Sequence, residues 1–360
     1  MSATYLLSSV SDSAPLRSPT SPTSAPGTPG AKEQGHSDAV WAAKWARLAG
    51  GGEVVVTGGA DHSIKTWDPA SPAAPTSTIR PHKSLGIVSL DVDKSEAGAS
   101  FFVSSTVDSV ISRWSFDGQQ QGRKELGPAH SWAVSLHPRT EVLATAGQEG
   151  RARILSASAE GFGEELAVLE AAGSFGSAVE YSKGGNLLAV ASESGYVTLF
   201  DAETGSLVSS FPAHSAPIRS LSFTSNLLVT GSDDKRINVF DLRALTSTGA
   251  NAGAGGRRGQ VASLGGHDGW VVNVEARNER LLASGSSDGT IKLFDLSSPS
   301  SALSTLRDHT GDVWALSWAP EALNAAPPVE GLGGAAAGLG GGRLVSAGED
   351  GKVRFWRGSG

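Results

Sequence analysis

One short segment, Leu281 to Leu296, most constrains what this chain can fold into. Its sequence, LLASGSSDGTIKLFDL, has two apolar runs separated by a Ser-Asp-Gly step, which predicts two short strands joined by a tight turn. A Gly-His pair at 266–267 precedes the segment, and an aromatic residue followed by Asp closes it. Such a unit cannot bury its own apolar face. It therefore indicates a repeat fold only if it recurs along the chain.

The same residue pattern occurs five times with constant internal spacing. In each copy an Asp lies six residues before a Trp or Phe, and a Ser or Thr lies four residues before that Asp. The five sets, each opened by a His, are His36, Thr57, Asp61 and Trp67; His82, Ser104, Asp108 and Trp114; His214, Thr230, Asp234 and Phe240; His267, Ser284, Asp288 and Phe294; and His309, Ser346, Asp350 and Trp356. Repeats of roughly 40–45 residues with this signature are typical of β-propellers.

Two weaker copies fill the interval between the second and third sets. Residues 142–155 keep Thr145 and place Glu149 where the other copies have Asp, but no Gly-His pair opens them. Residues 187–201 keep the strand pattern, with Ser194 at the Asp position. With these two copies the chain contains seven repeats.

Seven four-stranded blades close into a ring, and closure removes the exposed edges of an open array. The last repeat ends near Trp356 without an outer strand, and residues 4–10 form a lone strand at the other end of the chain. We therefore predict an all-β, seven-bladed propeller as the single domain of residues 1–360. Its repeats occupy residues 35–356, and the strand at 4–10 closes the ring.

The recurring His, Asp and hydroxyl residues are interpreted as structural. A His between blades can bond both the turn Asp and the strand hydroxyl, which satisfies buried polar groups and fixes the turn. A catalytic site of this composition would have to occur five times. The remaining histidines, His62, His130 and His137, are expected at solvated turns or strand ends and lack the clustering of a metal site. The sequence thus predicts no catalytic residue, no metal and no cofactor.

Composition narrows the function classes further. The formal net charge of −7 argues against a nucleic-acid footprint, which requires clustered Lys and Arg. The chain has no Cys, which excludes disulfides, Cys-based zinc sites and thiol catalysis. No apolar run approaches the ~20 residues that cross a bilayer, and no secretory signal pattern opens the chain. We expect a soluble intracellular protein without direct nucleic-acid or membrane partners.

Three segments interrupt the repeats. Residues 11–34, rich in Ser, Thr, Pro and Gly, are expected to be disordered. Residues 243–259 and 320–342 are expected to be low-complexity loop insertions in turns that open on one face of the ring. We therefore expect the partner site on the opposite face, which residues 11–34 enter. That segment carries three candidate sites for proline-directed phosphorylation, Ser18, Ser21 and Thr28.

The face with short connections carries the candidate partner site. Large aromatic residues or Arg recur where the innermost strands begin beside the central channel, and they are Trp41, Trp132, Phe175, Arg219, Trp270 and Trp314. Aromatic residues and Arg are enriched in interface hot spots, and an exposed apolar patch marks a binding site. The alternative is that some of these Trp residues pack between blades, as we expect for Trp45 and Trp318.

The repeats resemble those of WD-repeat propellers. More narrowly, the order of complete and incomplete blades resembles the WD-repeat subunit of the superkiller complex, in particular its fungal members. The stretches that carry this resemblance are HSDAVW at 36–41, GPAHSW at 127–132, AHSAPIRSLSF at 213–223, HTGDVW at 309–314 and the ending VRFWRG. The chain departs from that family at 11–34, 246–258 and 321–342, where family members are shorter.

This resemblance implies a non-enzymatic scaffold that docks a large tetratricopeptide subunit through its aromatic face. The assembly it implies also contains an RNA helicase and supports 3′-to-5′ mRNA decay by the cytoplasmic exosome. It further implies a protein that is not an obligate homo-oligomer and is located in the cytoplasm, with a nuclear role left open.

Two other function classes remain open. One is a WD-repeat adaptor of a different complex, in meiotic recombination, in RNA polymerase II elongation or as a ubiquitin-ligase substrate receptor. The other is an enzyme or small-ligand propeller, which would place several carboxylates or His around the channel. The sequence indicates only Asp312 and Arg219 near the channel rim, without a convergent acid–base set.

Overall fold

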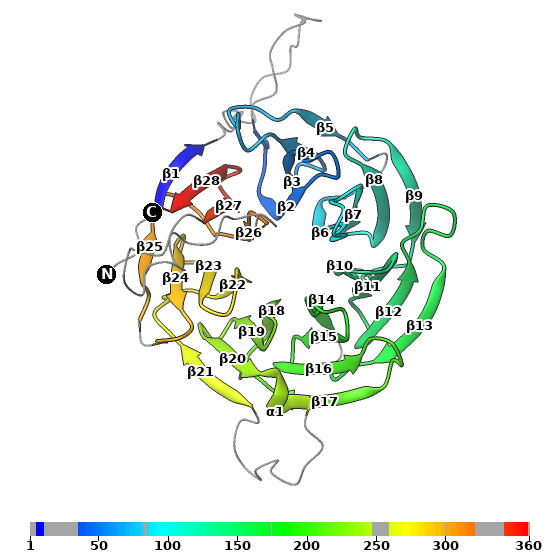
Figure 1. Ribbon diagram of the computed structural model, residues 1–360, viewed down its shortest axis with the longest axis vertical. Helices are drawn as coiled ribbons and strands as arrows, with labels where there is room; N and C mark the ends of the chain where they lie inside the picture. Colours follow the sequence, from blue (N-terminus) through cyan, green and yellow to red (C-terminus); the bar gives the residue numbers. More distant parts are fainter. Residues whose placement is uncertain are drawn as a thin grey trace, which may run out of the picture.

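The structure, a computed structural model, describes residues 5–10, 35–81, 85–173, 175–246, 259–299, 301–320 and 342–358. These residues form seven antiparallel four-stranded sheets arranged as blades around a central channel (Figure 1). The predicted seven-bladed propeller is therefore confirmed. His82, residues 11–34 with their three candidate phosphorylation sites, and most of the insertions at 243–259 and 320–342 lie outside the described residues.

Each blade runs from an innermost strand at the channel to an outermost strand at the rim of the disc. From inside outward the strands are β2 (Val40–Arg47), β3 (Glu53–Gly59), β4 (Ile64–Trp67) and β5 (Ser77–Ile79) in blade 1; β6 (Ile87–Val92), β7 (Phe101–Thr106), β8 (Val110–Ser115) and β9 (Gln120–Glu125) in blade 2; β10 (Ala133–Leu136), β11 (Val142–Ala146), β12 (Arg151–Ser156) and β13 (Glu165–Glu170) in blade 3; β14 (Gly176–Tyr181), β15 (Leu187–Ser192), β16 (Tyr196–Asp201) and β17 (Leu207–Pro212) in blade 4; β18 (Ile218–Phe223), β19 (Leu227–Ser232), β20 (Ile237–Asp241) and β21 (Gln260–Leu264) in blade 5; β22 (Val271–Ala276), β23 (Leu281–Ser286), β24 (Ile291–Asp295) and β25 (Ser304–Leu306) in blade 6; and β26 (Ala315–Trp318), β27 (Arg343–Ala347), β28 (Val353–Gly358) and β1 (Tyr5–Val10) in blade 7.

The hydrophobic core lies between the blades. Second strands such as β7 and β23 are buried along their whole length, because each of their two faces meets a neighbouring blade. Outer strands such as β9, with the sequence QQGRKE, are polar and mostly exposed. Trp45 and Trp318 pack in this core at 5% and 6% exposure, as predicted, with the Trp45 ring edge-on to Phe355.

The ring closes in blade 7 through both ends of the chain. β1 pairs antiparallel with β28, with Tyr5 opposite Gly358 and Val10 opposite Arg354, and the two strands lie side by side in Figure 1. This confirms the closure predicted from the missing outer strand. Blade 7 would otherwise end in the unpaired edge of β28.

One part of the predicted insertion at 243–259 is a short helix instead of a loop. α1 spans Leu242–Thr246, directly after β20. The helix forms because Leu242 and Leu245 are buried beside blade 5 and the Asp241 carboxylate accepts a hydrogen bond from the Arg243 backbone N–H at 2.9 Å. No helix in the described part of the chain is long and apolar enough to cross a membrane.

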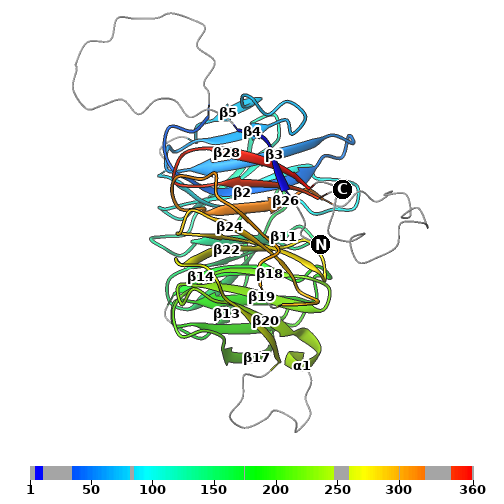
Figure 2. The same ribbon diagram turned by 90° about the vertical axis from the view of Figure 1, so that its left-hand side faces the viewer.

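Seen edge-on, the strands run between two faces of a disc (Figure 2). The innermost strands all run in the same direction. Their first residues therefore gather on one face, called here the near face, and their last residues on the opposite, far face. The turns between the second and third strands, which carry the repeated Asp residues, lie on the near face.

Candidate functional site

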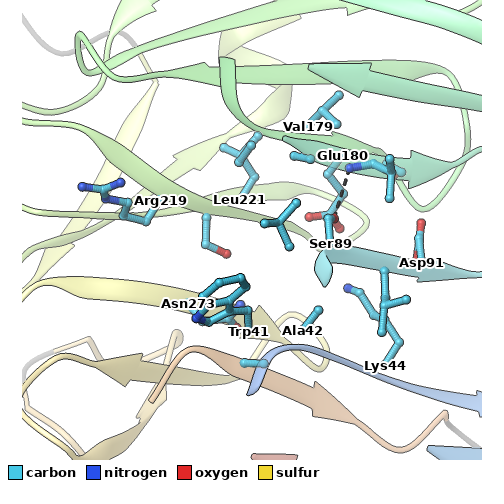
Figure 3. A pocket seen from close by; sticks show the side chains of 18 of the residues that line it. Trp41, Ala42, Lys44, Ser89, Asp91, Val179, Glu180, Arg219, Leu221 and Asn273 are labelled. Carbon is cyan, nitrogen blue, oxygen red and sulfur yellow. Dashed lines mark hydrogen bonds between the residues drawn. The ribbon is translucent and has the colours of Figure 1, made fainter. Parts of the chain in front are cut away.

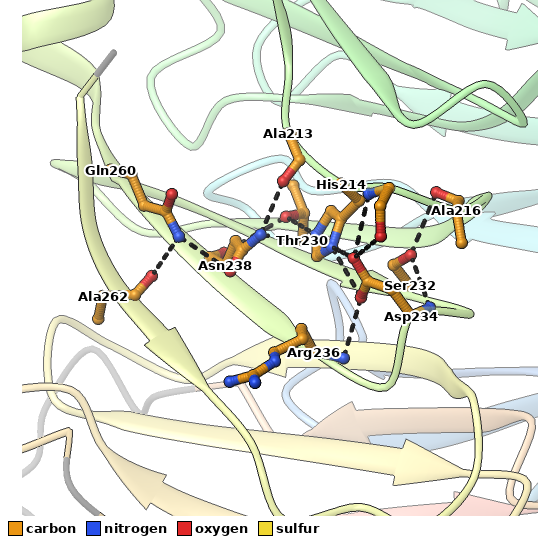
Figure 4. Close-up of polar contacts among 11 residues, drawn as sticks. Ala213, His214, Ala216, Thr230, Ser232, Asp234, Arg236, Asn238, Gln260 and Ala262 are labelled. Carbon is orange, nitrogen blue, oxygen red and sulfur yellow. Dashed lines mark hydrogen bonds and ion pairs between the residues drawn. The ribbon is translucent and has the colours of Figure 1, made fainter. Parts of the chain in front are cut away.

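The repeated polar sets form the hydrogen bonds expected of them. In blade 5, His214 Nε2 lies 2.7 Å from Thr230 Oγ1 and Nδ1 lies 2.9 Å from an Asp234 oxygen (Figure 4). The sets opened by His36, His267 and His309 have the same arrangement. In three blades the Trp adds a bond, donating Nε1–H to the strand hydroxyl at 2.8–2.9 Å.

Electrostatics favours a neutral His beside a charged Asp in these sets. Burial lowers the pKa of His36 and His309, and the neighbouring Asp only partly opposes this effect. Burial alone would raise the pKa of Asp61 and Asp350, but the hydrogen bond and charge of the His ring, together with further hydrogen bonds and charges nearby, outweigh burial, and the pKa falls below its usual range. The sets therefore fix turns within the fold.

The two weak copies, in blades 3 and 4, have hydrogen bonds between hydroxyl groups in place of the His-Asp-hydroxyl set. In blade 3 the Thr145 hydroxyl donates to Ser131 Oγ at 2.6 Å, while Glu149, at a backbone φ of 72°, pairs with Arg151. In blade 4 Ser194 Oγ lies 2.9 Å from Ser192 Oγ. Neither blade has a His-Asp pair at its near-face turn.

The prediction of solvated histidines holds for His62 and is wrong for His137. His62 is exposed. His137 is half-buried, with Nε2 at 2.9 Å from the Gly185 carbonyl and its ring edge-on to Tyr181 at 5.0 Å. His130 is also half-buried, and its Nδ1 lies 3.1 Å from Arg153. No cluster of three or more metal-ligating side chains occurs in the described ranges.

The predicted partner residues gather at the near-face mouth of the channel. Four of them, Trp41, Trp132, Arg219 and Trp314, line a cavity of about 440 Å³ that occupies the channel. The other two flank this mouth, because Phe175 contacts Trp132 and Trp270 lies beside Arg219. We call these six residues the rim.

Two pairs of neighbouring side chains stiffen the rim. The rings of Trp132 and Phe175, from adjacent blades, meet edge-on at a centroid distance of 5.9 Å. The Arg219 guanidinium lies 5.9 Å from the Trp270 ring and donates to both Asp233 oxygens at 2.8 and 2.6 Å. Trp132 and Trp270 nevertheless remain 39% and 48% exposed, whereas Trp41 and Trp314 are partly buried.

A second layer of the channel was not predicted. At the equivalent position of its innermost strand every blade has a polar residue, and four of the seven, Lys44, Asp91, Ser135 and Glu180, line the channel cavity. These seven residues, called here the channel ring, are Lys44, Asp91, Ser135, Glu180, Ser222, Glu275 and Ser317. Figure 3 shows Lys44, Asp91 and Glu180, from three different blades, around the same space.

Part of the channel ring joins neighbouring blades. Asp91 accepts a hydrogen bond from the backbone N–H of Leu136 at 2.7 Å, and Ser135 accepts one from Tyr181 at 3.1 Å. Ser222 and Ser317 accept equivalent bonds from the next blades at 2.9 and 3.0 Å. Each bond satisfies a buried strand N–H that faces the adjacent blade.

The charged members of the channel ring influence one another. Burial alone would lower the pKa of Lys44, but the carboxylates of Glu275, Asp91 and Glu180 outweigh burial and raise it. Burial and the neighbouring Glu275 raise the pKa of Glu180 to about 7, although Lys44 and Lys94 partly oppose them. No ion pair within 4.0 Å engages Glu180 or Glu275 among the described residues.

The channel ring corrects the expectation that the channel lacks a convergent acid–base set. Three carboxylates and Lys44 meet there, with Lys94 paired to Asp91 at 2.7 Å. The set still lacks a nucleophile hydrogen-bonded to a base, the arrangement that covalent catalysis requires. The sequence signal that would have revealed it is a polar residue at the same position of the innermost strand in all seven blades.

Seven four-stranded blades, with a His-Asp-hydroxyl set in four of them among the described residues, define a WD-repeat β-propeller, a class whose members generally serve as non-catalytic scaffolds for protein interactions. The chain carries WD40 repeats. Residues 27–68 and 300–357 match the family described as WD domain, G-beta repeat. Residues 165–322 match the family described as Nucleolar protein 10-like, N-terminal domain.

The chain is also similar to several proteins of known description. WD repeat-containing protein SL1-17 of Schistosoma mansoni is 28% identical over 59% of this chain and 69% of its own length. Meiotic recombination protein rec14 of Schizosaccharomyces pombe is 26% identical over 34% of this chain and 40% of its own length. Human DDB1- and CUL4-associated factor 10 is 34% identical over 32% of this chain but only 19% of its own length.

Proposed function

We propose that the protein is a non-enzymatic scaffold subunit of a superkiller-type complex and that its rim docks a segment of the tetratricopeptide subunit. The observation that carries the proposal is the aromatic mouth of the channel. Trp132 and Trp270 keep 39% and 48% of their surface exposed on the face with short turns. Exposed Trp residues of this kind mark a surface that a partner covers.

The rim has the composition and order of an interface hot spot. Trp and Arg are the residues most enriched in such sites. The contacts between Trp132 and Phe175, and between Arg219, Asp233 and Trp270, hold these side chains in place before a partner arrives. Binding then costs little ordering of the scaffold.

The choice of a superkiller-type complex rests on resemblance. The stretches at 36–41 and 309–314 end in the rim residues Trp41 and Trp314, and the stretch at 213–223 contains Arg219. The similarity to a meiotic recombination protein supports the proposal, because that family has members resembling meiotic partners. The complex would add an RNA helicase as a further partner and act with the exosome in cytoplasmic mRNA decay.

A ubiquitin-ligase substrate receptor is the second candidate. The similarity to DDB1- and CUL4-associated factor 10 favours it, at 34% identity over 120 residues. That similarity covers about a third of this chain, and the described residues form one propeller without a second domain. In this alternative the same rim would hold a substrate segment.

Affinity purification from the native organism separates the two. We expect the tagged protein to capture a tetratricopeptide protein and an RNA helicase in near-equal amounts, and the Trp270→Ala variant to lose both. Tyr196→Ala is the matched control, since Tyr196 is 40% exposed on the third strand of blade 4, away from the rim. Recovery of a cullin ligase instead would support the second candidate. Capture that survives rim substitution would refute the site.

A further inference from the structure

The far-face mouth of the channel has a different chemistry from the rim. Where the innermost strands leave the channel, blades 1, 2, 3 and 4 carry Arg47, Lys94, Arg139 and Lys183. All four side chains belong to exposed residues. We call these four residues the far mouth. They stand on consecutive blades of a chain whose net charge is −7.

Direct contacts join the turns that carry the far mouth. The Ala99 backbone N–H donates to the Arg47 carbonyl at 2.7 Å, which links blades 1 and 2. Lys94 Nζ reaches the Leu136 carbonyl at 3.3 Å, and His137 Nε2 lies 2.9 Å from the Gly185 carbonyl, which links blades 2, 3 and 4. The cations therefore occupy one continuous surface.

Most carboxylates in the turns between the first and second strands form hydrogen bonds or ion pairs with neighbouring residues. Asp93 accepts hydrogen bonds from Ser95 and Ser100, Glu141 pairs with Arg113, and Glu53 forms a double ion pair with Arg343. The side chains of Arg47, Arg139 and Lys183, by contrast, form no hydrogen bond or ion pair among the described residues, and Glu96 is the single unengaged carboxylate between β6 and β7. Three cationic side chains of this surface are therefore available to a partner.

A groove gives this surface a shape. Between blades 2 and 3 a cavity of about 250 Å³ is lined by Arg139, by the hydroxyls of Ser95, Ser100 and Thr140, and by the carboxylates of Asp93 and Glu141, among others. The hydroxyls and both carboxylates are engaged within the fold, so the Arg139 guanidinium is the group of this groove that stays open to a carboxylate of a partner. The neighbouring Lys94 and Arg139 also contribute to lowering the pKa of His137, after burial, as expected in a positive field.

From these contacts and charges we infer that the far mouth is a second interaction surface, which binds a short acidic peptide segment of a partner. A short segment fits better than a nucleic acid. The outer turns of the same face carry exposed Asp117, Glu160 and Glu203, which would repel a long polyanion extending beyond the mouth. A short acidic segment can remain over the four cations and the groove.

Fluorescence anisotropy on the full chain tests this surface with three labelled probes of twelve residues or nucleotides: a Glu/Asp-rich peptide, its Gln/Asn counterpart and an oligo-uridine RNA. We expect the acidic peptide alone to bind at low salt. Arg47→Glu combined with Lys183→Glu should weaken binding roughly ten-fold, because two attractive charges become repulsive. The charge-matched control, Lys124→Glu with Arg236→Glu, should bind like the parent, since both residues are exposed away from the mouth.

Three results would overturn the inference: no binding of the acidic peptide at low salt, equal binding of parent and far-mouth variant, or tighter binding of the RNA. Circular dichroism melting of each variant excludes unfolding as the cause of a loss. The surface lies on the opposite face from the rim, so Trp270→Ala should leave peptide binding unchanged. If the acidic peptide does not bind, the proposed function of the rim is unaffected. If the rim binds no partner, the proposal for the far mouth is likewise unaffected.

Discussion

Glu180 should make the stability of the ring depend on pH in a direction unusual for a carboxyl group. Burial and the nearby Glu275 raise its pKa from 4.5 to about 7 in the folded protein. Between these two pH values the native protein keeps a proton that the unfolded chain has released. The contribution of Glu180 to stability therefore falls as pH rises through this window and is constant above it.

The size of the effect follows from the displaced pKa. At about 1.36 kcal/mol per pH unit, the displacement corresponds to roughly 3 kcal/mol. Glu180 keeps some surface open to the channel, so solvent screening reduces the figure to about 2 kcal/mol. Glu180→Gln retains the shape of the side chain without the charge. We expect the variant to match the parent near pH 4, below the unfolded pKa, and to exceed its unfolding free energy by about 2 kcal/mol at pH 8.

Urea unfolding of both proteins at half-unit pH intervals measures this difference. The His and Asp residues of the repeated sets also titrate, but they are common to both proteins and cancel in the difference. Ser135→Ala, at another channel-ring position, is the control, and its stability difference from the parent should not vary with pH. A difference for Glu180→Gln that is flat, or that shrinks toward pH 8, would contradict the argument that burial among carboxylates raises this pKa.

Three further predictions concern the rim, the repeated sets and the closure of the ring. Trp270→Ala should weaken partner binding about thirty-fold, the typical effect of losing a hot-spot residue, and should leave the melting temperature unchanged; calorimetric titration and a thermal scan check both. Asp288→Ala should lower the unfolding free energy by about 1–3 kcal/mol, because His267 and Thr290 lose their partner. The parent should lose this contribution as pH falls, since the folded pKa of Asp288 is lowered, and equal urea midpoints at pH 7 would refute it. Deleting residues 1–10 should lower the melting temperature markedly, because β28 loses its pairing with β1, and an unchanged melt would refute that role.

The fold was predictable because its determinants are local. The spacing from Thr57 through Asp61 to Trp67 reports hydrogen bonds within one hairpin and its neighbouring loop, and the bond from the His ring to the strand hydroxyl repeats in four blades. The positions of Trp41, Arg219 and Trp314 at the channel mouth were predictable for the same reason, since each lies five residues after a blade-opening His, where an innermost strand begins. The short helix α1 was missed because five residues after a strand give no helical periodicity, and the burial of Leu245 stabilises it.

The channel ring could not be predicted from short sequence patterns, because its residues meet only in the closed ring. Lys44 and Glu275 lie far apart in the sequence, and only the closed ring brings their side chains into the same channel. Within a single strand each looks like an ordinary polar position in an alternating pattern. Their mutual effect on pKa depends on ring closure and on register, which exist only in the assembled fold. The far mouth was missed for the same reason, because its cations come from four different blades.

The pairing of the two chain ends gives the ring a mechanical seam. Tyr5 lies opposite Gly358 and Val10 opposite Arg354, so the free ends of β1 and β28 point away from the same end of the pair. A force that pulls these ends apart loads the hydrogen bonds between β1 and β28 one after another, as in a zipper, instead of all at once. Tension on the termini would therefore detach β1 first, while blades 1 to 6 keep all of their strands.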